Sequence, residues 1–178
     1  MESGPLLCVA TVKSNKLVNG GCIEISVAGI GETFLAWVAT PMAGSDRGVL
    51  FLPEVGDQVL VAMVAGADVK WAVLGSLWSS NEMPTETNAD GENDEKVIRT
   101  RGGNVVKLVD TKNAERIEIA TVRKGAAGDT INKISIDTSN DAVVIDAAGS
   151  ITLTAKSITI HAKDGDLVLQ GGPNVKIN

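Results

Sequence analysis

Hydrophobic and polar residues alternate in short runs along the first 80 residues, and turn residues separate the runs. The runs at residues 6–12, 22–27, 33–38, 58–64 and 73–78 predict β-strands, and a shorter strand is expected at residues 49–52. None of these runs has the spacing of an amphipathic helix. Five or six short strands in about 75 residues predict a small closed β-barrel rather than a sandwich.

The pattern changes after Lys96, where pairs of aliphatic residues recur about every eight residues. Polar residues separate the two members of most pairs, so each predicted strand has one apolar and one wet face. Such a repeat predicts a stacked β architecture, in which glycines between the units allow sharp turns. The pairs are Ile134/Ile136, Val143/Ile145, Ile151/Leu153, Ile158/Ile160, Leu167/Leu169 and Val175/Ile177.

Aromatic residues are absent from the 100 residues that follow Trp78, and all five of the chain lie within residues 34–78. Each repeat unit offers two or three aliphatic side chains, worth about 1.5–3 kcal/mol apiece when buried. Ordering a unit costs about 1–2 kcal/mol for each of its roughly eight residues. One chain cannot offset this cost, whereas three chains around a common axis can. We therefore expect an obligate homotrimer with these axial residues: Ile136, Ile145, Leu153, Ile160, Leu169 and Ile177.

Charge divides the chain further. Residues 81–95 contain six acidic and no basic side chains, which indicates a solvated linker between a domain at 1–80 and a domain at 96–178. Asp90-Gly91-Glu92-Asn93-Asp94 lacks the spacing of an EF-hand, so we set a calcium loop aside. The net charge is −6 and no segment is strongly basic, so we do not expect nucleic-acid binding.

Residues able to support catalysis or hold a metal are scarce. His161 is the one histidine, and alternation places it on an outward position of the repeat. Cys8 and Cys22 lie in apolar runs without metal-ligand spacing, which favours two buried thiols over a disulfide. Phosphate-binding loops and nucleophile motifs do not occur. The sequence therefore predicts no enzyme, no cofactor and no metal site.

Two phrases resemble a known family. Phe51-Leu52-Pro53-Glu54-Val55-Gly56-Asp57, continuing to Val61, and Val73-Leu74-Gly75-Ser76-Leu77-Trp78 are similar to the OB-fold domain of contractile-injection spike proteins. That family includes phage baseplate assembly protein V, the central spikes of contractile-tailed phages and the type VI secretion spike. Residues 98–104 and 115–119 resemble the start of its trimeric β-helical needle. The resemblance implies an all-β chain, an N-terminal OB-fold barrel followed by an intertwined trimeric β-helix.

The resemblance also implies a function and partners. Such a spike caps the inner tube through a hub and punctures the target envelope, contacting the membrane only transiently. Five residues precede the first predicted strand, so we expect the hub to be a separate protein, and the 15-residue linker is too short for an enzyme domain. We expect baseplate and inner-tube proteins as further partners. The spike would be made in the cytoplasm, assembled into a phage tail or tail-like particle and delivered outward on contraction.

The end of the chain carries a further expectation. A blunt trimeric end exposes unpaired strand edges, which invite a cap. We expect a tip protein of the proline-alanine-alanine-arginine-repeat (PAAR) type to cover Val175, Lys176, Ile177 and Asn178. The alternative function is a trimeric tail-fibre or adhesin module that binds a surface ligand, and the bare repeat at the end favours the spike. The sequence leaves open whether the apparatus is a phage, a bacteriocin, a secretion system or an extracellular injection particle.

Overall fold

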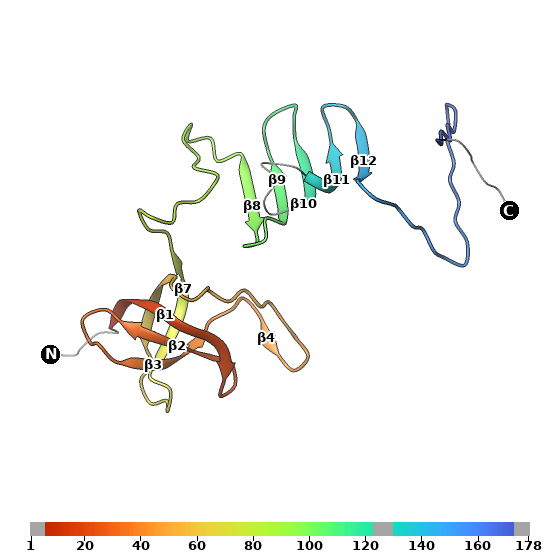
Figure 1. Ribbon diagram of the computed structural model, residues 1–178. Helices are drawn as coiled ribbons and strands as arrows, with labels where there is room; N and C mark the ends of the chain where they lie inside the picture. Colours follow the sequence, from red (N-terminus) through yellow and green to blue (C-terminus); the bar gives the residue numbers. More distant parts are fainter. Residues whose placement is uncertain (1–5, 123–129, 173–178) are drawn as a thin grey trace. The chain divides into compact units, whose positions relative to one another are not determined.

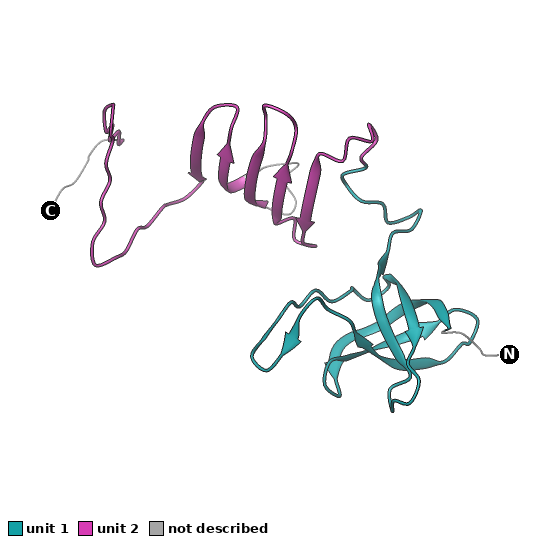
Figure 2. Cartoon of the chain, turned by 180° about the vertical axis from the view of Figure 1, so that it is seen from behind, with its two compact units in different colours: residues 1–87 teal, residues 88–178 magenta. Residues whose placement is uncertain are grey.

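A computed structural model of the chain describes residues 6–122 and 130–172, and every regular element in them is a β-strand (Figure 1). The chain divides into two units, residues 1–87 and 88–178 (Figure 2). The predicted linker at 81–95 is divided between the two units. A bridge between Ser79 and Glu82 lies in the first, and residues 88–94 lead into the second.

The first unit contains a closed barrel whose strands follow the order β1-β2-β3-β7-β6. All neighbouring strands are antiparallel except β3 and β7, which are parallel. Two predicted strands have the observed bounds, β2 and β3, whereas β1 continues six residues beyond the predicted run through two register irregularities. The barrel strands are β1 (Leu7–Val18), β2 (Cys22–Val27), β3 (Thr33–Val38), β6 (Gln58–Met63) and β7 (Trp71–Leu77).

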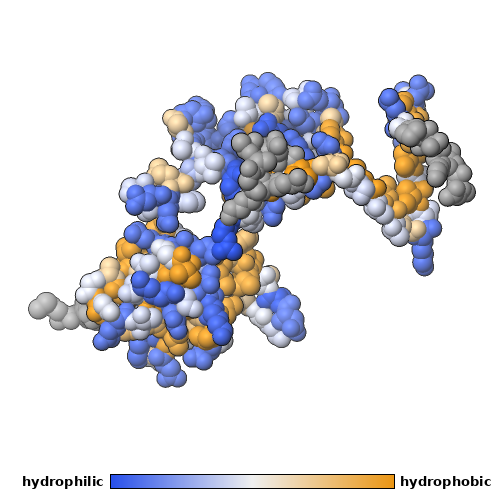
Figure 3. Space-filling view, viewed as in Figure 1, coloured by the Kyte–Doolittle hydropathy of each residue, from blue (hydrophilic) through white to orange (hydrophobic). Residues whose placement is uncertain are grey.

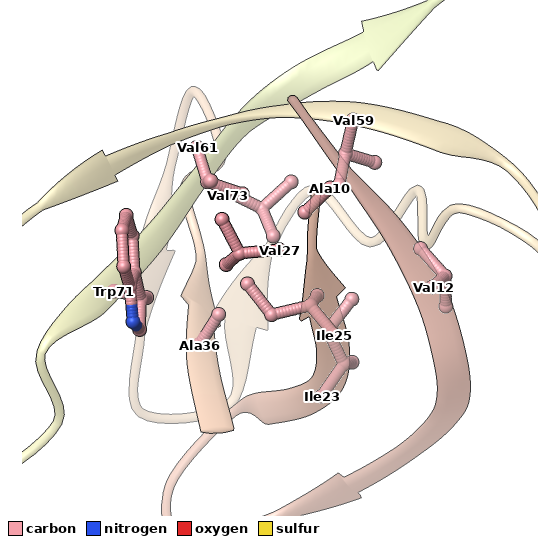
Figure 4. Packing of buried hydrophobic residues seen from close by; sticks show 10 residues of the cluster. All are labelled: Ala10, Val12, Ile23, Ile25, Val27, Ala36, Val59, Val61, Trp71 and Val73. Carbon is pink, nitrogen blue, oxygen red and sulfur yellow. The ribbon is translucent and has the colours of Figure 1, made fainter. Parts of the chain in front are cut away.

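The barrel core comes from the inward positions of these alternating strands (Figure 4). Small β-branched residues fill most of it, and Trp71 occupies one side, with its ring centroid 6.1 Å from that of Phe34. Every member is at most 3% exposed, so the barrel has an interior of its own. The core residues are Ala10, Val12, Ile23, Ile25, Val27, Ala36, Val59, Val61, Trp71 and Val73.

The predicted strand at residues 49–52 is wrong. Two-residue strands, β4 (Ala43–Gly44) and β5 (Arg47–Gly48), instead form a small hairpin that projects from the barrel (Figure 1). Val49 donates its backbone N–H to Met42 O over 3.0 Å and accepts a hydrogen bond from the Thr40 hydroxyl. Hydrogen bonds within the loop therefore hold this short apolar run in place, without pairing to a sheet. We call residues 40–52 the arm.

The described residues of the second unit form one antiparallel sheet in which the strands follow one another in chain order from β8 to β12 (Figure 2). Short turns join most of the strands, and three of these turns contain a residue with positive φ, namely Gly103, Asn113 and Asp141. Residues 148–172 form no strand. The strands are β8 (Glu95–Arg99), β9 (Val105–Val109), β10 (Arg116–Val122), β11 (Thr130–Asp137) and β12 (Ala142–Ala147).

Candidate functional site: an uncovered apolar sheet face

The OB-fold phrase at residues 51–57 forms a turn that is fastened to β1. Gly56 donates its backbone N–H to Val12 O over 3.0 Å, and Val12 donates to Asp57 O over the same distance. The Asp57 carboxylate accepts from the Glu54 N–H at 2.8 Å, and Pro53 is buried. Gly56 has φ of 102°, a conformation that side chains disfavour. The spacing of this phrase is therefore a structural requirement of the barrel.

The second phrase lies in β7, directly opposite β6. Gly75 pairs with Leu60, Ser76 with Val59 and Leu77 with Gln58, and the register shifts between Leu60 and Val61. Leu74 is the extra residue at this irregularity, because the next pair along β6 joins Val61 to Val73. Both phrases thus serve the closure of the barrel between β6 and its two neighbours.

A groove of about 600 Å³ lies where the arm meets the barrel. Its walls are mainly apolar and include Trp37, Met42 and Phe51, while Asp46 and Arg47 are its charged side chains. The described lining offers no histidine, cysteine or pair of carboxylates for acid–base or nucleophilic chemistry. The groove is therefore not a candidate active site.

One face of the second sheet is apolar and lies open to solvent. Strand pairing sets its side chains directly opposite one another, for example Ile117 with Leu108 and Ile136, and Ile134 with Ile119 and Ile145. Leu108, Val143 and the isoleucines of this set are between 44% and 69% exposed. We call this set the apolar face: Ile98, Val106, Leu108, Ile117, Ile119, Ile134, Ile136, Val143 and Ile145.

Polar pairs border the apolar face at both ends of its strands. Lys96 Nζ lies 3.0 Å from Asp110 Oδ2 at one end, and the Asn132 side-chain amide donates to the Thr121 hydroxyl over 3.1 Å at the other. Thr138 donates its hydroxyl to Glu115 Oε2 over 2.8 Å beside the first pair. An apolar centre with a polar border is the usual composition of a protein–protein interface.

The opposite face of the same sheet is covered differently. Long charged side chains lie along it in ion pairs, with Lys107 Nζ 2.9 Å from Glu95 Oε2 and Lys133 Nζ 2.8 Å from Glu118 Oε2. The small residues between them are buried, namely Val105, Val109, Ala120 and Ser135. The sheet therefore shields its polar face within one chain and leaves its apolar face without cover, the reverse of what a stable single-chain domain requires.

The segment after β12 repeats this exposure without forming a sheet. Aliphatic side chains are open along it (Figure 3), and its leucines, isoleucines and Val168 are between 50% and 75% exposed. Exposed apolar rows on this scale mark interaction surfaces. The large aliphatics of residues 149–172 are Ile151, Leu153, Ile158, Ile160, Leu167, Val168 and Leu169.

The predicted axial residues are placed in three ways. Ile136 and Ile145 lie together on the apolar face. Leu153, Ile160 and Leu169 lie on the segment after β12, and their place at a trimer axis stays a prediction. Ile177 and the predicted tip contacts at Val175, Lys176 and Asn178 lie outside the described residues.

Sequence reasoning missed most of the apolar face, although the signal was present. It selected one member of each aliphatic pair, whereas the neighbouring Ile134 and Val143 share the same face. The earlier strands carry the same two-residue spacing, as in Val106 with Leu108 and Ile117 with Ile119. Counting every apolar residue two positions apart from Ile98 onward would have identified the face.

The single histidine and the two cysteines complete the inventory of reactive side chains. His161 is exposed, and Cys8 and Cys22 are free thiols, the first half-buried and the second buried. Burial raises the pKa of the Cys22 thiol, which keeps it protonated, and its Sγ lies 3.6 Å from Asn19 O. The described residues contain no cluster of three or more metal-ligating side chains, and no helix among them is long and apolar enough to cross a membrane.

Comparison with known families assigns the barrel. Residues 10–78 match the family described as the type VI secretion system/phage-baseplate injector OB domain, a range that runs from β1 to the residue after β7. The barrel is therefore similar to this family of injector OB domains, which supports the predicted resemblance to baseplate spikes. The similarity favours a baseplate-related role for the barrel. A comparison with curated proteins found no match.

Proposed function

We propose that the protein is the central spike of a contractile injection apparatus and acts as a homotrimer. Three barrels would form a collar that attaches through a separate hub to the inner tube. The second units would form a needle that punctures the target envelope when the apparatus contracts. The role is mechanical, without catalysis, cofactor or metal.

The apolar face is the observation that carries this proposal. Nine aliphatic side chains on one side of a sheet, each worth about 1.5–3 kcal/mol when fully buried, contribute little while they remain in water. Three such faces turned toward a common axis would cover one another. The polar pairs at Lys96–Asp110 and Thr121–Asn132 would then lie at the borders of that core.

The segment after β12 supports an intertwined needle. Ordering residues 149–172 costs about 1–2 kcal/mol for each residue, and no strand partner within the described chain offsets this cost. In an intertwined trimer the segment would pair with equivalent segments of the other copies, and its aliphatic rows would face the axis. A needle held by bonds between chains has the kinetic stability that piercing requires.

Native mass spectrometry tests the assembly directly. We expect a species with the mass of three 18.4 kDa chains, stable on dilution to low micromolar concentration. A folded species of one chain under the same conditions would overturn the trimer and the puncturing role with it. The tip is tested separately, by co-expression with a PAAR-type protein. Co-purification of the two supports a capped tip, and an isolated trimer that leaves the partner free contradicts it.

A further inference from the structure

We propose that the groove between the arm and the barrel binds an extended apolar segment of another protein, one that carries a carboxylate opposite Arg47. The segment would lie along residues 50–52 as an added strand. The proposal goes beyond the spike function, which assigns no role to the arm, and it does not depend on the number of chains in the assembly.

Residues 50–52 have the backbone of a strand that lacks a neighbour. Neither a turn nor a bend occurs over residues 49–54, so the chain runs without a sharp change of direction. Val49 is held by hydrogen bonds within the arm, but the backbone N–H and C=O groups of residues 50–52 bond to no residue that the structure describes. A row of unpaired backbone groups is a template for a further strand.

The side chains of the same run are exposed beside an apolar hollow. Leu50 and Phe51 are 70% and 69% exposed, and Met42 on the other side of the arm is 48% exposed. All three line the groove of about 600 Å³, together with Trp37. This volume lies within the range of about 300–1,000 Å³ that is usual for ligand sites. Alternate side chains of an added strand would be covered there.

Arg47 determines the charge that the segment should carry. Its strand partner Gly44 has no side chain, and the guanidinium occupies that space, since a Cβ on Gly44 would lie 3.0 Å from Arg47 Cζ. The guanidinium forms no hydrogen bond or ion pair within the described part of the chain. Asp46, the other charged residue of the groove, accepts a hydrogen bond from the Ser45 hydroxyl in the turn at the tip. A carboxylate is the natural partner of Arg47, because it accepts two parallel N–H bonds from a guanidinium.

An extended peptide satisfies all three features of the groove, whereas other apolar ligands satisfy fewer. A lipid chain or a small apolar molecule would fill the groove but offers no row of N–H and C=O groups to residues 50–52. A helix would offer apolar side chains, but its backbone groups are already bonded internally. A strand supplies main-chain bonds for affinity and alternate side chains for specificity. The expected segment therefore alternates aliphatic and polar residues and carries an aspartate, a glutamate or a C-terminal carboxylate.

Peptide selection on the full-length protein tests the chemistry of the occupant. The probe is a display library of random ten-residue peptides, and we expect the enriched peptides to share alternating aliphatic residues and an acidic residue. In methionine-methyl NMR spectra, the best synthetic peptide should shift the signal of Met42, which lines the groove, and leave that of Met63 unchanged. Enrichment of basic peptides, no enrichment, or an unshifted Met42 signal would overturn the proposal. Enriched peptides that match a segment of this chain would identify a second copy as the occupant and overturn it as well.

An exchange of charge tests the pairing with Arg47. Arg47→Glu should weaken binding of the acidic peptide about tenfold or more, and a peptide with lysine at the acidic position should restore the affinity. Lys70→Glu makes the same change at an exposed lysine outside the groove and should bind the acidic peptide like the wild type. An Arg47→Glu variant with wild-type affinity for the acidic peptide contradicts the pairing.

Two further variants separate the position of the guanidinium from the apolar contacts. Gly44→Val should displace the Arg47 guanidinium and weaken binding of the acidic peptide, but it should not affect the same peptide with asparagine at the acidic position. Phe51→Ser should weaken binding of both peptides. Val55→Ser, at a residue 60% exposed and outside the groove lining, is its control and should weaken neither. Equal effects of Phe51→Ser and Val55→Ser would show that the groove is not the binding surface.

The outcomes separate this inference from the proposed function. A groove that selects no peptide overturns the inference, while a wild-type trimer in native mass spectra still supports the spike. A wild-type single chain that binds the acidic peptide overturns the spike and leaves this inference in place. Intrinsic fluorescence checks that the barrel is folded in every variant, because all three tryptophans lie between residues 37 and 78.

Discussion

The barrel and the second sheet use similar aliphatic residues, yet they bury them in opposite ways. In the barrel, alternation directs one side of every strand into an enclosed interior, and Ile23 and Ile25 lose all contact with water. In the second sheet the same alternation gathers isoleucines on one side, but the sheet does not curl into a closed structure and its isoleucines stay about half exposed. Burial thus depends on whether the sheet closes into a barrel. The same alternation of residues is compatible with a complete core in one chain or with one part of a core shared between chains.

The largest effect expected within this comparison is a deletion in the barrel core. Ile25→Ala should lower the free energy of unfolding of the barrel by about 2–5 kcal/mol, because it leaves a cavity in an enclosed interior. Urea unfolding followed by tryptophan fluorescence measures this transition. The same substitution on the apolar face, Ile134→Ala, should leave the fluorescence transition unchanged. An equal loss of unfolding free energy in both variants would mean that the two units unfold together, and the barrel core and the apolar face would then not differ in this respect.

Dilution should lower the stability of the second sheet but not of the barrel, by less than the core substitution lowers that of the barrel. A core enclosed within one chain is independent of concentration, whereas a shared core weakens by mass action. For a three-chain assembly we expect about 1 kcal/mol of lost protection per chain for each tenfold dilution, in amides of residues 95–147. Hydrogen exchange with mass spectrometry reports both regions in one experiment. If barrel and sheet amides respond alike to dilution, the sheet has no shared core.

Acid should produce the smallest effect, at the turns of the second sheet. The Thr138 hydroxyl lowers the pKa of Glu115, and the Ser139 hydroxyl and N–H lower the pKa of Asp137. A carboxylate whose pKa is lower in the folded state stabilises that state above its unfolded pKa, and this contribution is lost as the pH falls through the folded value. We therefore expect a small loss of stability to begin near pH 4.5 and to grow as the pH falls.

Melting temperatures of the wild type and of Thr138→Val between pH 5 and pH 3 check this expectation. The variant should be less stable at pH 5 and should approach the wild type at pH 3. A constant difference between the two proteins across this range would show that the Thr138 hydrogen bond acts independently of the Glu115 charge.

The barrel could be predicted from sequence to a useful degree. Strands β2 and β3 have the predicted bounds because clear alternation ends at turn residues, such as Asn19-Gly20-Gly21 before β2. The extension of β1 could not be predicted, since Lys13-Ser14-Asn15-Lys16 carries no apolar signal and is held by pairing with β2. Residues 49–52 of the arm were mistaken for a strand, because their apolar side chains give a strand-like signal while Val49 is held by hydrogen bonds within the arm.

The sequence predicted that an apolar face exists in the second unit, but it named only some of the residues on that face. Alternation reveals which residues share a face, and Ile136 and Ile145 do lie on one face of the sheet, while their place at a trimer axis stays a prediction. It does not reveal whether the next strand comes from the same chain or from another copy, because both satisfy the same pattern. Five strands pair within one chain and residues 148–172 do not, a boundary that depends on turn geometry and strand pairing rather than on hydrophobic period.

The open sheet has a consequence for how the molecule must be produced. Before the proposed trimer forms, a newly made chain would expose the apolar face together with the unpaired edge of β12, where strands of other proteins could pair. The yield of trimer would then depend on whether copies associate with one another faster than they bind unrelated strands. Producing many copies close together in space and time favours the correct encounter.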